Sequence, residues 1–345
     1  MKPIVSLLLV IGIAVGAWFL IDRMSDDSNG DVPTVDDGGT QKKKDEGGDT
    51  SLTGVSTDAT LIVPESAKLK TEAAAVLVGH NNDQWTASIL QAMQSMKDLK
   101  YASWFYELTP RGGLDAPGPG PGEFRGLPGL ESRPDANYLE DNDIRVLFLD
   151  TLDPNLLGTK FWDVVAQRVR SGRMGLYVRP NFPKGMTRND AAPTVHPVLT
   201  HPVVKDLIPV TKAKELRGTP LPGSYGQNLQ TLVATDAGVT HPATRLVPDA
   251  EASRNIWNAA KMGKGAISTV FVYPVETPRT GEQILIDMDN GDFPAVIVAK
   301  SPDMRVLWMG NGDFSTDLHF EREKAKFQYM LLTHWITWLV GQADD

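Results

Sequence analysis

Residues 143–181 decide the fold, and they read DIRVLFLD (143–150), TLDPNLLGTKFWDVVAQRVRSGRM (151–174) and GLYVRPN (175–181). The first segment is a largely apolar run closed by Asp150, which is typical of a buried strand. The second places apolar residues from Phe161 to Val169 at helical spacing and stops at Gly172. The third starts another short apolar run. Two buried strands joined by an amphipathic helix predict a parallel sheet with helices on both faces.

Ligands of such sheets bind beyond the carboxyl ends of the strands. Here those ends are Asp150 and the loop that carries Arg179 and Asn181, so these residues are candidates for a site. Asp150 and Asp153 also fit a structural role, because aspartate caps the turn that follows a strand. We therefore favour a capping role over a chemical role for these two aspartates.

Further elements flank this unit. Residues 73–78 predict a strand ending near Gly79, residues 83–96 an amphipathic helix, and residues 101–108 another strand. The later predictions are a strand and a helix at 229–234 and 248–260, strands at 266–274, 283–288, 295–300 and 304–310, and a closing helix at 321–340. The fold class is therefore α/β: a flavodoxin-like, mostly parallel sheet flanked by helices, with room for antiparallel last strands.

The N-terminal residues 3–21 form an apolar run long enough to span a bilayer. A cleaved secretory signal is the alternative, with Ala17 at the cleavage point, but the apolar run continues past it. Lys2 precedes the run and acids follow it, which predicts a cytoplasmic N-terminus. We expect a single-pass protein of the cytoplasmic membrane with its body on the extracytoplasmic side.

Residues 22–60 are rich in acidic residues and glycine and lack apolar periodicity, which predicts a disordered tether. The folded α/β domain is expected at 61–345. Within it, residues 110–141 form an insertion rich in proline and glycine. Such an insertion is either functional, in which case it lies over the strand edge, or disordered.

The chain has 345 residues, a net charge of -9 and no cysteine. The missing cysteine excludes disulfides, thiolate metal sites and cysteine nucleophiles. The sequence shows no basic stripe of the kind that binds a phosphate backbone, so we expect no nucleic-acid partner.

Several phrases together resemble a known family; they are IRVLFLD, GLYVRPN, HPATRL, RVLWMGNGD and FQYMLLTHWITWLV. They are similar to the class I glutamine amidotransferase-like superfamily, and in particular to the C-terminal amidotransferase-like domains of planctomycete-type bacterial membrane proteins. The resemblance covers residues 71–341. Active members use a cysteine at a strand-to-helix elbow and a His-x-Glu pair near the C-terminus.

The resemblance places the elbow after GLYVRP, where this chain offers Asn181 and no nucleophile. Glutamine amidotransferase activity is therefore excluded. His319 and Glu321 supply a His-x-Glu pair, which is half of a triad, although the sequence favours the simpler interpretation of Glu321 as an acid in the first turn of a helix. The HPATR phrase makes His241 and Arg245 candidates for the ligand edge.

The sequence favours a membrane-anchored, non-catalytic module that binds a partner protein or a small ligand at the carboxyl edge, without a cofactor. We expect no metal, because prolines between His196 and His201 prevent a helix that would align them. One alternative is a hydrolase of altered chemistry that uses His319, Glu321 and Asp150. Another is a carbohydrate-related binding domain, which requires exposed aromatic residues such as Trp104 or Phe124 at the edge.

Overall fold

A computed structural model describes residues 65–80, 84–106, 124–127, 130, 133–180, 197–210, 230–262, 268–269, 282–288, 294–299, 303–310 and 321–343. They all belong to one compact unit, Ser56–Asp345. The predicted anchor and tether lie outside the described residues. None of the helices in these ranges has the length and apolar character that crossing a membrane requires.

One sheet organises the described residues. Its strands are β1 (Ala73–His80), β2 (Leu99–Tyr106), β3 (Phe124–Gly126), β4 (Val146–Asp150), β5 (Gly175–Arg179), β6 (Gln230–Ala234), β7 (Ser268–Thr269), β8 (Gln283–Met288), β9 (Pro294–Val298) and β10 (Val306–Met309). They are ordered β3-β2-β1-β4-β5-β10-β9-β8-β6-β7. Strands β2, β1, β4, β5 and β10 are parallel neighbours, and the remaining pairs are antiparallel. The expected α/β class, with a parallel body and antiparallel last strands, is confirmed.

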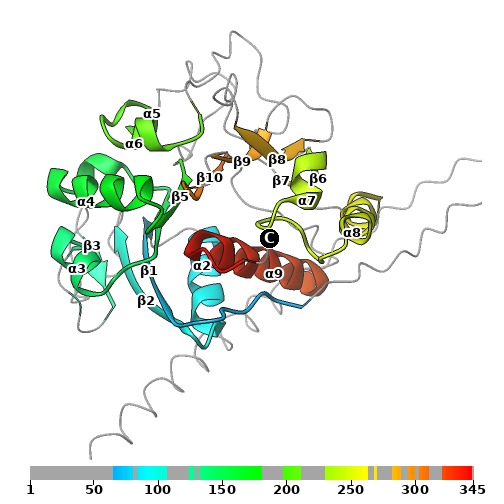
Figure 1. Ribbon diagram of the computed structural model, residues 1–345, viewed down its shortest axis with the longest axis horizontal. Helices are drawn as coiled ribbons and strands as arrows, with labels where there is room; N and C mark the ends of the chain where they lie inside the picture. Colours follow the sequence, from blue (N-terminus) through cyan, green and yellow to red (C-terminus); the bar gives the residue numbers. More distant parts are fainter. Residues whose placement is uncertain are drawn as a thin grey trace, which may run out of the picture. The chain divides into compact units, whose positions relative to one another are not determined.

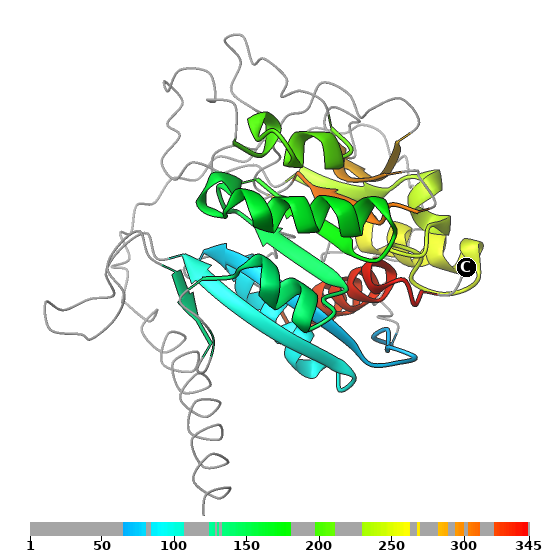
Figure 2. The same cartoon turned by 60° about the vertical axis from the view of Figure 1, so that its left-hand side comes forward.

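Helices cover both faces of the sheet. They are α2 (Gln84–Ser95), α3 (Ala136–Asp141), α4 (Thr159–Arg170), α5 (Pro197–Thr200), α6 (Val204–Leu207), α7 (Asp236–Thr240), α8 (Ala250–Met262) and α9 (Glu321–Val340), with a short 3-10 helix η1 (Pro154–Leu156). Helices α3 and α4 lie on one face of the parallel strands, and α2 and α9 lie on the other (Figures 1 and 2).

The alternation of side chains along β1 builds two cores. Ala75 and Leu77 join the core beneath α2 and α9, while Val76 and Val78 join the core beneath α3 and α4. All four side chains are fully buried. A strand that is apolar on both faces is what the uninterrupted run in the sequence predicts for an interior parallel strand.

The helix of the deciding stretch ends where its sequence predicts. Gly172 follows α4 with a φ of 69°, the left-handed conformation that glycine adopts without steric cost. Two residues later β5 begins at Gly175, whose backbone lies against the Leu339 carbonyl of α9. A methyl group at Gly175 would come within 2.3 Å of that oxygen, so this helix and strand approach closely only because residue 175 is glycine.

The proline- and glycine-rich insertion contains two ordered elements. Strand β3 pairs antiparallel with the end of β2, where Phe124 lies opposite Tyr106. Helix α3 begins after Asp135, whose carboxylate accepts a hydrogen bond from the Tyr138 N–H at 2.8 Å. The composition pointed to disorder or to function at the edge. These elements show local order at the β2 border of the sheet.

The segment before β1 is fastened to the closing helix. The Ala67 N–H donates to Thr333 Oγ1 at 3.0 Å. Farther along, Gln342 Oε1 accepts from the Lys70 N–H at 2.7 Å and from the Thr71 N–H at 2.9 Å. We call residues 65–72 the strap; it brings the chain to β1 alongside the end of α9.

Candidate functional site

The candidate site is the carboxyl edge where the strand order reverses. From β1 the parallel strands continue to β2 on one side and to β4 on the other, so the βα connections leave in opposite directions. In open α/β sheets this reversal creates the crevice in which ligands bind. The residues at this edge are His80 at the end of β1, Asp150 at the end of β4 and Arg179 at the end of β5.

Asp150 and Arg179 form a fully buried ion pair. Arg179 Nε donates to Asp150 Oδ1 at 2.6 Å, and Nη2 donates to Oδ2 at 2.8 Å. Their side chains are 0% and 1% exposed. The strand register places the two residues opposite each other, which makes the two-pronged geometry of guanidinium and carboxylate accessible. Asp150, a candidate for chemistry in the sequence, is held in this ion pair between two strand ends.

Helix α2 is joined to the same pair. Thr86, in its first turn, is fully buried and donates a short hydrogen bond to Asp150 Oδ2. Gly79 makes room for this contact, because a methyl group there would lie 2.8 Å from Thr86 Cγ2 and 3.0 Å from the Asp150 carbonyl oxygen. The carboxylate thus connects β4, β5 and the start of α2, and both of its oxygens are engaged by donors.

Thr151 is the unusual residue of this edge. It follows Asp150 with a φ of 56°, a conformation that is a true outlier for a β-branched residue. Its N–H donates to the Arg179 carbonyl at 2.8 Å, which fixes the turn. Its hydroxyl is buried and has no hydrogen-bond partner among the described residues. Strain and an unpaired hydroxyl in one residue are features that functional sites concentrate.

We expect Thr151→Gly to be more stable than Thr151→Ala by about 1 kcal/mol, because only glycine relieves the positive φ. Urea unfolding of both variants measures the difference. The control is Thr244, which is buried at an ordinary φ and should show the opposite order, with glycine less stable by about 0.5–1 kcal/mol. Equal stability of the two Thr151 variants would show that the turn stores no strain.

His80 closes the β1 side of the edge. It is 7% exposed, its Nδ1 lies 3.3 Å from the Tyr106 carbonyl oxygen, and its ring meets the Tyr106 ring edge-on. Tyr106 in turn packs against Phe124 of β3. Trp104, one of the two aromatic residues that a carbohydrate-binding edge would expose, is fully buried, and Phe124 is half-buried.

The HPATR residues lie at the other end of the strands. The His241 ring packs edge-on against Trp338 with centroids 5.0 Å apart, and its Nδ1 accepts from the Ala243 N–H at 3.1 Å. Trp338 directly precedes Leu339, whose carbonyl meets Gly175 at the start of β5. Asp150 and Arg179, by contrast, are the last residues of their strands. The structure therefore does not bring His241 to the carboxyl edge, and it supports a packing role for this residue.

We expect His241 to make the fold sensitive to acid. Burial, and then the charge of Arg245, lowers the pKa of His241 from 6.5 to about 4. The unfolded chain therefore takes up a proton at a higher pH than the folded chain, so stability is complete above pH 6.5 and is lost as the pH falls toward 4. The loss should be on the order of 3 kcal/mol.

Urea unfolding at several pH values tests this with His241→Asn, whose side-chain oxygen can still accept from the Ala243 N–H. The variant should lose part of the pH dependence between pH 6.5 and 4. Burial also lowers the pKa values of His201 and His334, so some dependence will remain. An unchanged pH dependence in the variant would contradict the assignment to His241.

Two other candidate residues, Asn181 and His319, lie outside the described residues. Glu321 is the first residue of α9, as its sequence position predicted, although its side chain is not described. Asp153 accepts from the Asn155 N–H at 2.9 Å and caps η1, which confirms the capping interpretation for that residue.

The described residues contain no group of three or more His, Asp or Glu side chains arranged to hold a metal ion. His201, one of the two histidines considered for metal binding, is buried against Trp162 with ring centroids 5.3 Å apart. Its Nδ1 faces the Val203 and Val204 N–H groups at 3.3 and 3.2 Å. This is a helix-capping arrangement, because His201 Nδ1 accepts hydrogen bonds from N–H groups at the start of α6.

Thr86, Gly79 and Thr151 complete the site, and the sequence did not single them out. Gly79 carried a signal, since a glycine at a strand end often permits close backbone approach. Thr151 carried none, because a positive φ on threonine is invisible in the sequence. No protein-family model and no curated protein matches this chain.

Proposed function

We propose that this protein is a non-catalytic, amidotransferase-like module that binds a small ligand or a partner segment at the carboxyl edge of its parallel strands. In chain order the parallel strands run 2-1-3-4-5 across the sheet, which is the order of flavodoxin-like folds. Active class I glutamine amidotransferases use a cysteine nucleophile, and this chain has no cysteine. The apolar residues 3–21 support attachment to the cytoplasmic membrane with the body on the extracytoplasmic side.

The observation that carries the proposal is the state of Asp150. Its oxygens accept three hydrogen bonds, two from Arg179 and one from Thr86, and its side chain is fully buried. A carboxylate engaged by three donors from two other elements holds β4, β5 and the start of α2 together. It makes the edge rigid, and recognition of a ligand needs groups that are held in fixed positions.

Thr151 supplies the contact by which the edge can be tested. Its unpaired hydroxyl is buried in the turn after β4, so a polar ligand atom completes its hydrogen bonding only when this turn opens. Thr151→Val removes the hydroxyl and keeps the branched shape. We expect this variant to be as stable as the parent or more stable by about 1 kcal/mol, because a buried polar group without a partner is removed.

The experiment uses the full chain purified in detergent. Thermal unfolding is followed with a panel of amino acids, amides, sugars and phosphate esters, and a hit is expected to stabilise the parent but not Thr151→Val. Glutamine and simple esters are assayed for hydrolysis in parallel, with Asp150→Asn and His319→Ala as comparison variants. Hydrolysis at an enzyme-like rate that depends on either residue would overturn the proposal.

A further inference from the structure

A second feature lies at the opposite, amino-terminal edge of the same strands. Arg145 directly precedes β4, Arg305 directly precedes β10, and Arg173 lies two residues before β5. The Gly175 N–H donates to the Arg145 carbonyl at 2.8 Å, and the Leu176 N–H donates to the Arg305 carbonyl at 2.9 Å. Neighbouring parallel strands begin at one edge, so these three arginines are brought together by the strand register.

Arg305 has a structural role in this group. Its Nε donates to the Leu339 carbonyl at 2.9 Å and its Nη2 donates to the Gly172 carbonyl at 2.7 Å, so its charge lies at the C-terminal ends of α9 and α4. Burial and the nearby charge of Arg145 lower the pKa of Arg305. Arg145 is 44% exposed and lies 3.5 Å from the Asp143 carboxylate.

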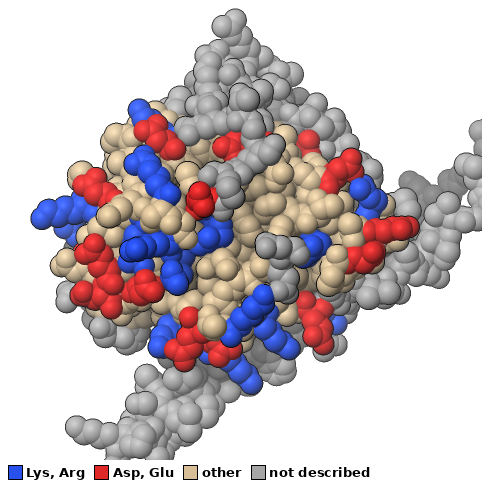
Figure 3. Space-filling model, in the orientation of Figure 1, with Lys and Arg blue, Asp and Glu red and all other residues tan. Residues whose placement is uncertain are grey.

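The last turn of α4 adds a further cation, Arg170. Arg170 and Arg173 are both exposed, and neither forms an ion pair with a described carboxylate. The acids beside them are Asp143, which is shared with Arg168, Asp303, whose backbone lies against Gly172, and Asp163, which lines a surface pocket together with Arg170. Figure 3 shows basic side chains gathered between the positions that α4 and α9 occupy in Figure 1.

This basic edge belongs to a chain whose net charge is -9, of which -6 lies in residues 22–60. An anionic surface attracts the basic edge and repels the acidic parts of the chain, so it selects an orientation. The strap also reaches β1 at this edge, since Lys70, Thr71 and Glu72 directly precede the strand. From there toward the N-terminus the strap runs back along α9, where the Ala67 N–H donates to Thr333 Oγ1.

We propose that Arg145, Arg170 and Arg173, which we call the arginine edge, lie against anionic phospholipid headgroups and contact their phosphates. Guanidinium groups suit this role because they bind phosphate through two hydrogen bonds at once. The inference rests on the proposed membrane attachment for its setting. It places the Asp150 edge on the side of the sheet that faces away from the lipid.

The test is the reactivity of single arginines in the full chain. The chain is mixed with vesicles of phosphatidylcholine, or of phosphatidylcholine with phosphatidylglycerol, and is modified with phenylglyoxal and mapped by mass spectrometry. We expect phosphatidylglycerol to slow modification of the arginine edge on the order of tenfold, and high salt to reverse the effect. Arg254, which is 47% exposed and paired with Asp236 on α8 and α7, should react equally with both vesicles.

Two variants of equal charge sharpen the result. In Arg145→Gln/Arg173→Gln the protection of Arg170 by phosphatidylglycerol should be lost, whereas in Lys160→Gln/Arg254→Gln it should persist. Equal modification rates with the two vesicles would overturn the proposal, as would equal slowing of Arg254. Slowing by inorganic phosphate alone, to the same extent, would overturn the assignment to a lipid surface.

Failure of the anchor is distinguishable from failure of this docking. A chain that does not float with phosphatidylcholine vesicles lacks the proposed anchor, yet the comparison between vesicles still decides the arginine edge, because an unanchored chain can bind phosphatidylglycerol from solution. Failure of ligand binding at Thr151 leaves both readouts unaffected, since that edge lies at the other ends of the strands.

Discussion

Asp150→Ala is expected to lower the free energy of unfolding by about 3–5 kcal/mol, because it leaves the Arg179 guanidinium buried without its carboxylate. The Thr86 hydroxyl loses its acceptor in the same step. Urea unfolding followed by tryptophan fluorescence measures the loss. Arg179→Ala should lower the free energy of unfolding by a similar amount, since it leaves the Asp150 carboxylate buried without its guanidinium partner.

A double-mutant cycle separates the pair from its surroundings. Asp150→Leu combined with Arg179→Met replaces both charges by apolar groups. This double variant should be more stable than Asp150→Leu alone or Arg179→Met alone by at least about 2 kcal/mol. Exposed Arg254→Ala, which breaks an exposed ion pair, is the control and should cost under about 1 kcal/mol. Additive losses in the double variant would contradict a coupled pair.

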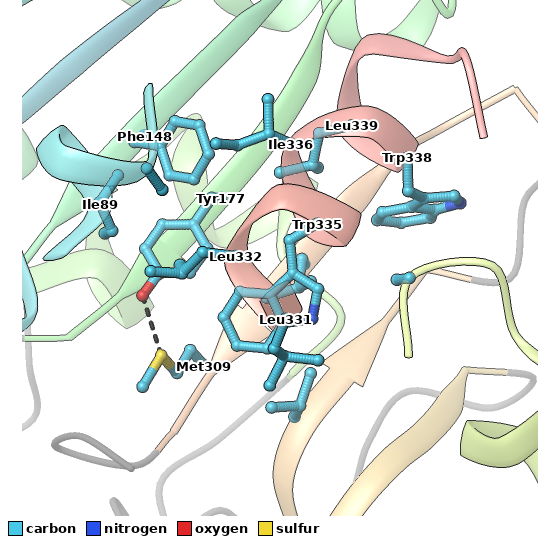
Figure 4. Close-up of a cluster of buried hydrophobic side chains, with 14 of the residues drawn as sticks. Ile89, Phe148, Tyr177, Met309, Leu331, Leu332, Trp335, Ile336, Trp338 and Leu339 are labelled. Atoms are coloured by element: carbon cyan, nitrogen blue, oxygen red, sulfur yellow. Dashed lines mark hydrogen bonds between the residues drawn. The ribbon is translucent and has the colours of Figure 1, made fainter. Parts of the chain in front are cut away.

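Trp335→Ala should have a comparable effect, with a loss of about 3–5 kcal/mol from the cavity it creates. Trp335 is fully buried, and its ring lies 6.1 Å from the rings of both Trp85 and Tyr177. Figure 4 shows it beside Tyr177, whose hydroxyl donates to the Met309 sulfur at 2.9 Å and accepts from Trp85 Nε1 at 2.8 Å. The indole therefore supports a buried hydrogen-bonded chain between α2, β5 and β10.

Equilibrium unfolding of Trp335→Phe provides the graded comparison, because it keeps an aromatic ring and should cost well under half as much. Tyr101→Ala removes an aromatic residue that is 36% exposed and should cost about 1 kcal/mol or less. A loss at Trp335 no larger than that at Tyr101 would show that α9 is not needed to cover this face.

The parallel body could be predicted from the sequence because its signals are local. Strand β1, helix α4 and helix α9 follow from uninterrupted apolar runs, helical spacing and the glycine at residue 172. The short elements β3 and α3 could not be predicted in the same way, since proline and glycine dominate the composition around them. They form because β3 completes a neighbouring strand edge and Asp135 caps α3.

The candidate site could be predicted only in part. Asp150 and Arg179 were both named, because each ends a strand, but their pairing depends on the register between β4 and β5. His241 was grouped with them by resemblance alone, and the structure places it against α9 instead. The contribution of Thr151 depends on a backbone angle and a missing partner, and both belong to the folded state alone.

The strap has a mechanical consequence. A force applied through the N-terminal segment is divided at Thr71, because Gln342 accepts from the N–H of this residue and also donates to its carbonyl at 3.0 Å. The load passes into α9 as well as β1, and β1 lies between β2 and β4. Pulling β1 out of the sheet breaks its hydrogen bonds to β2 and to β4 together, whereas a strand at the edge of the sheet has only one neighbour to separate from.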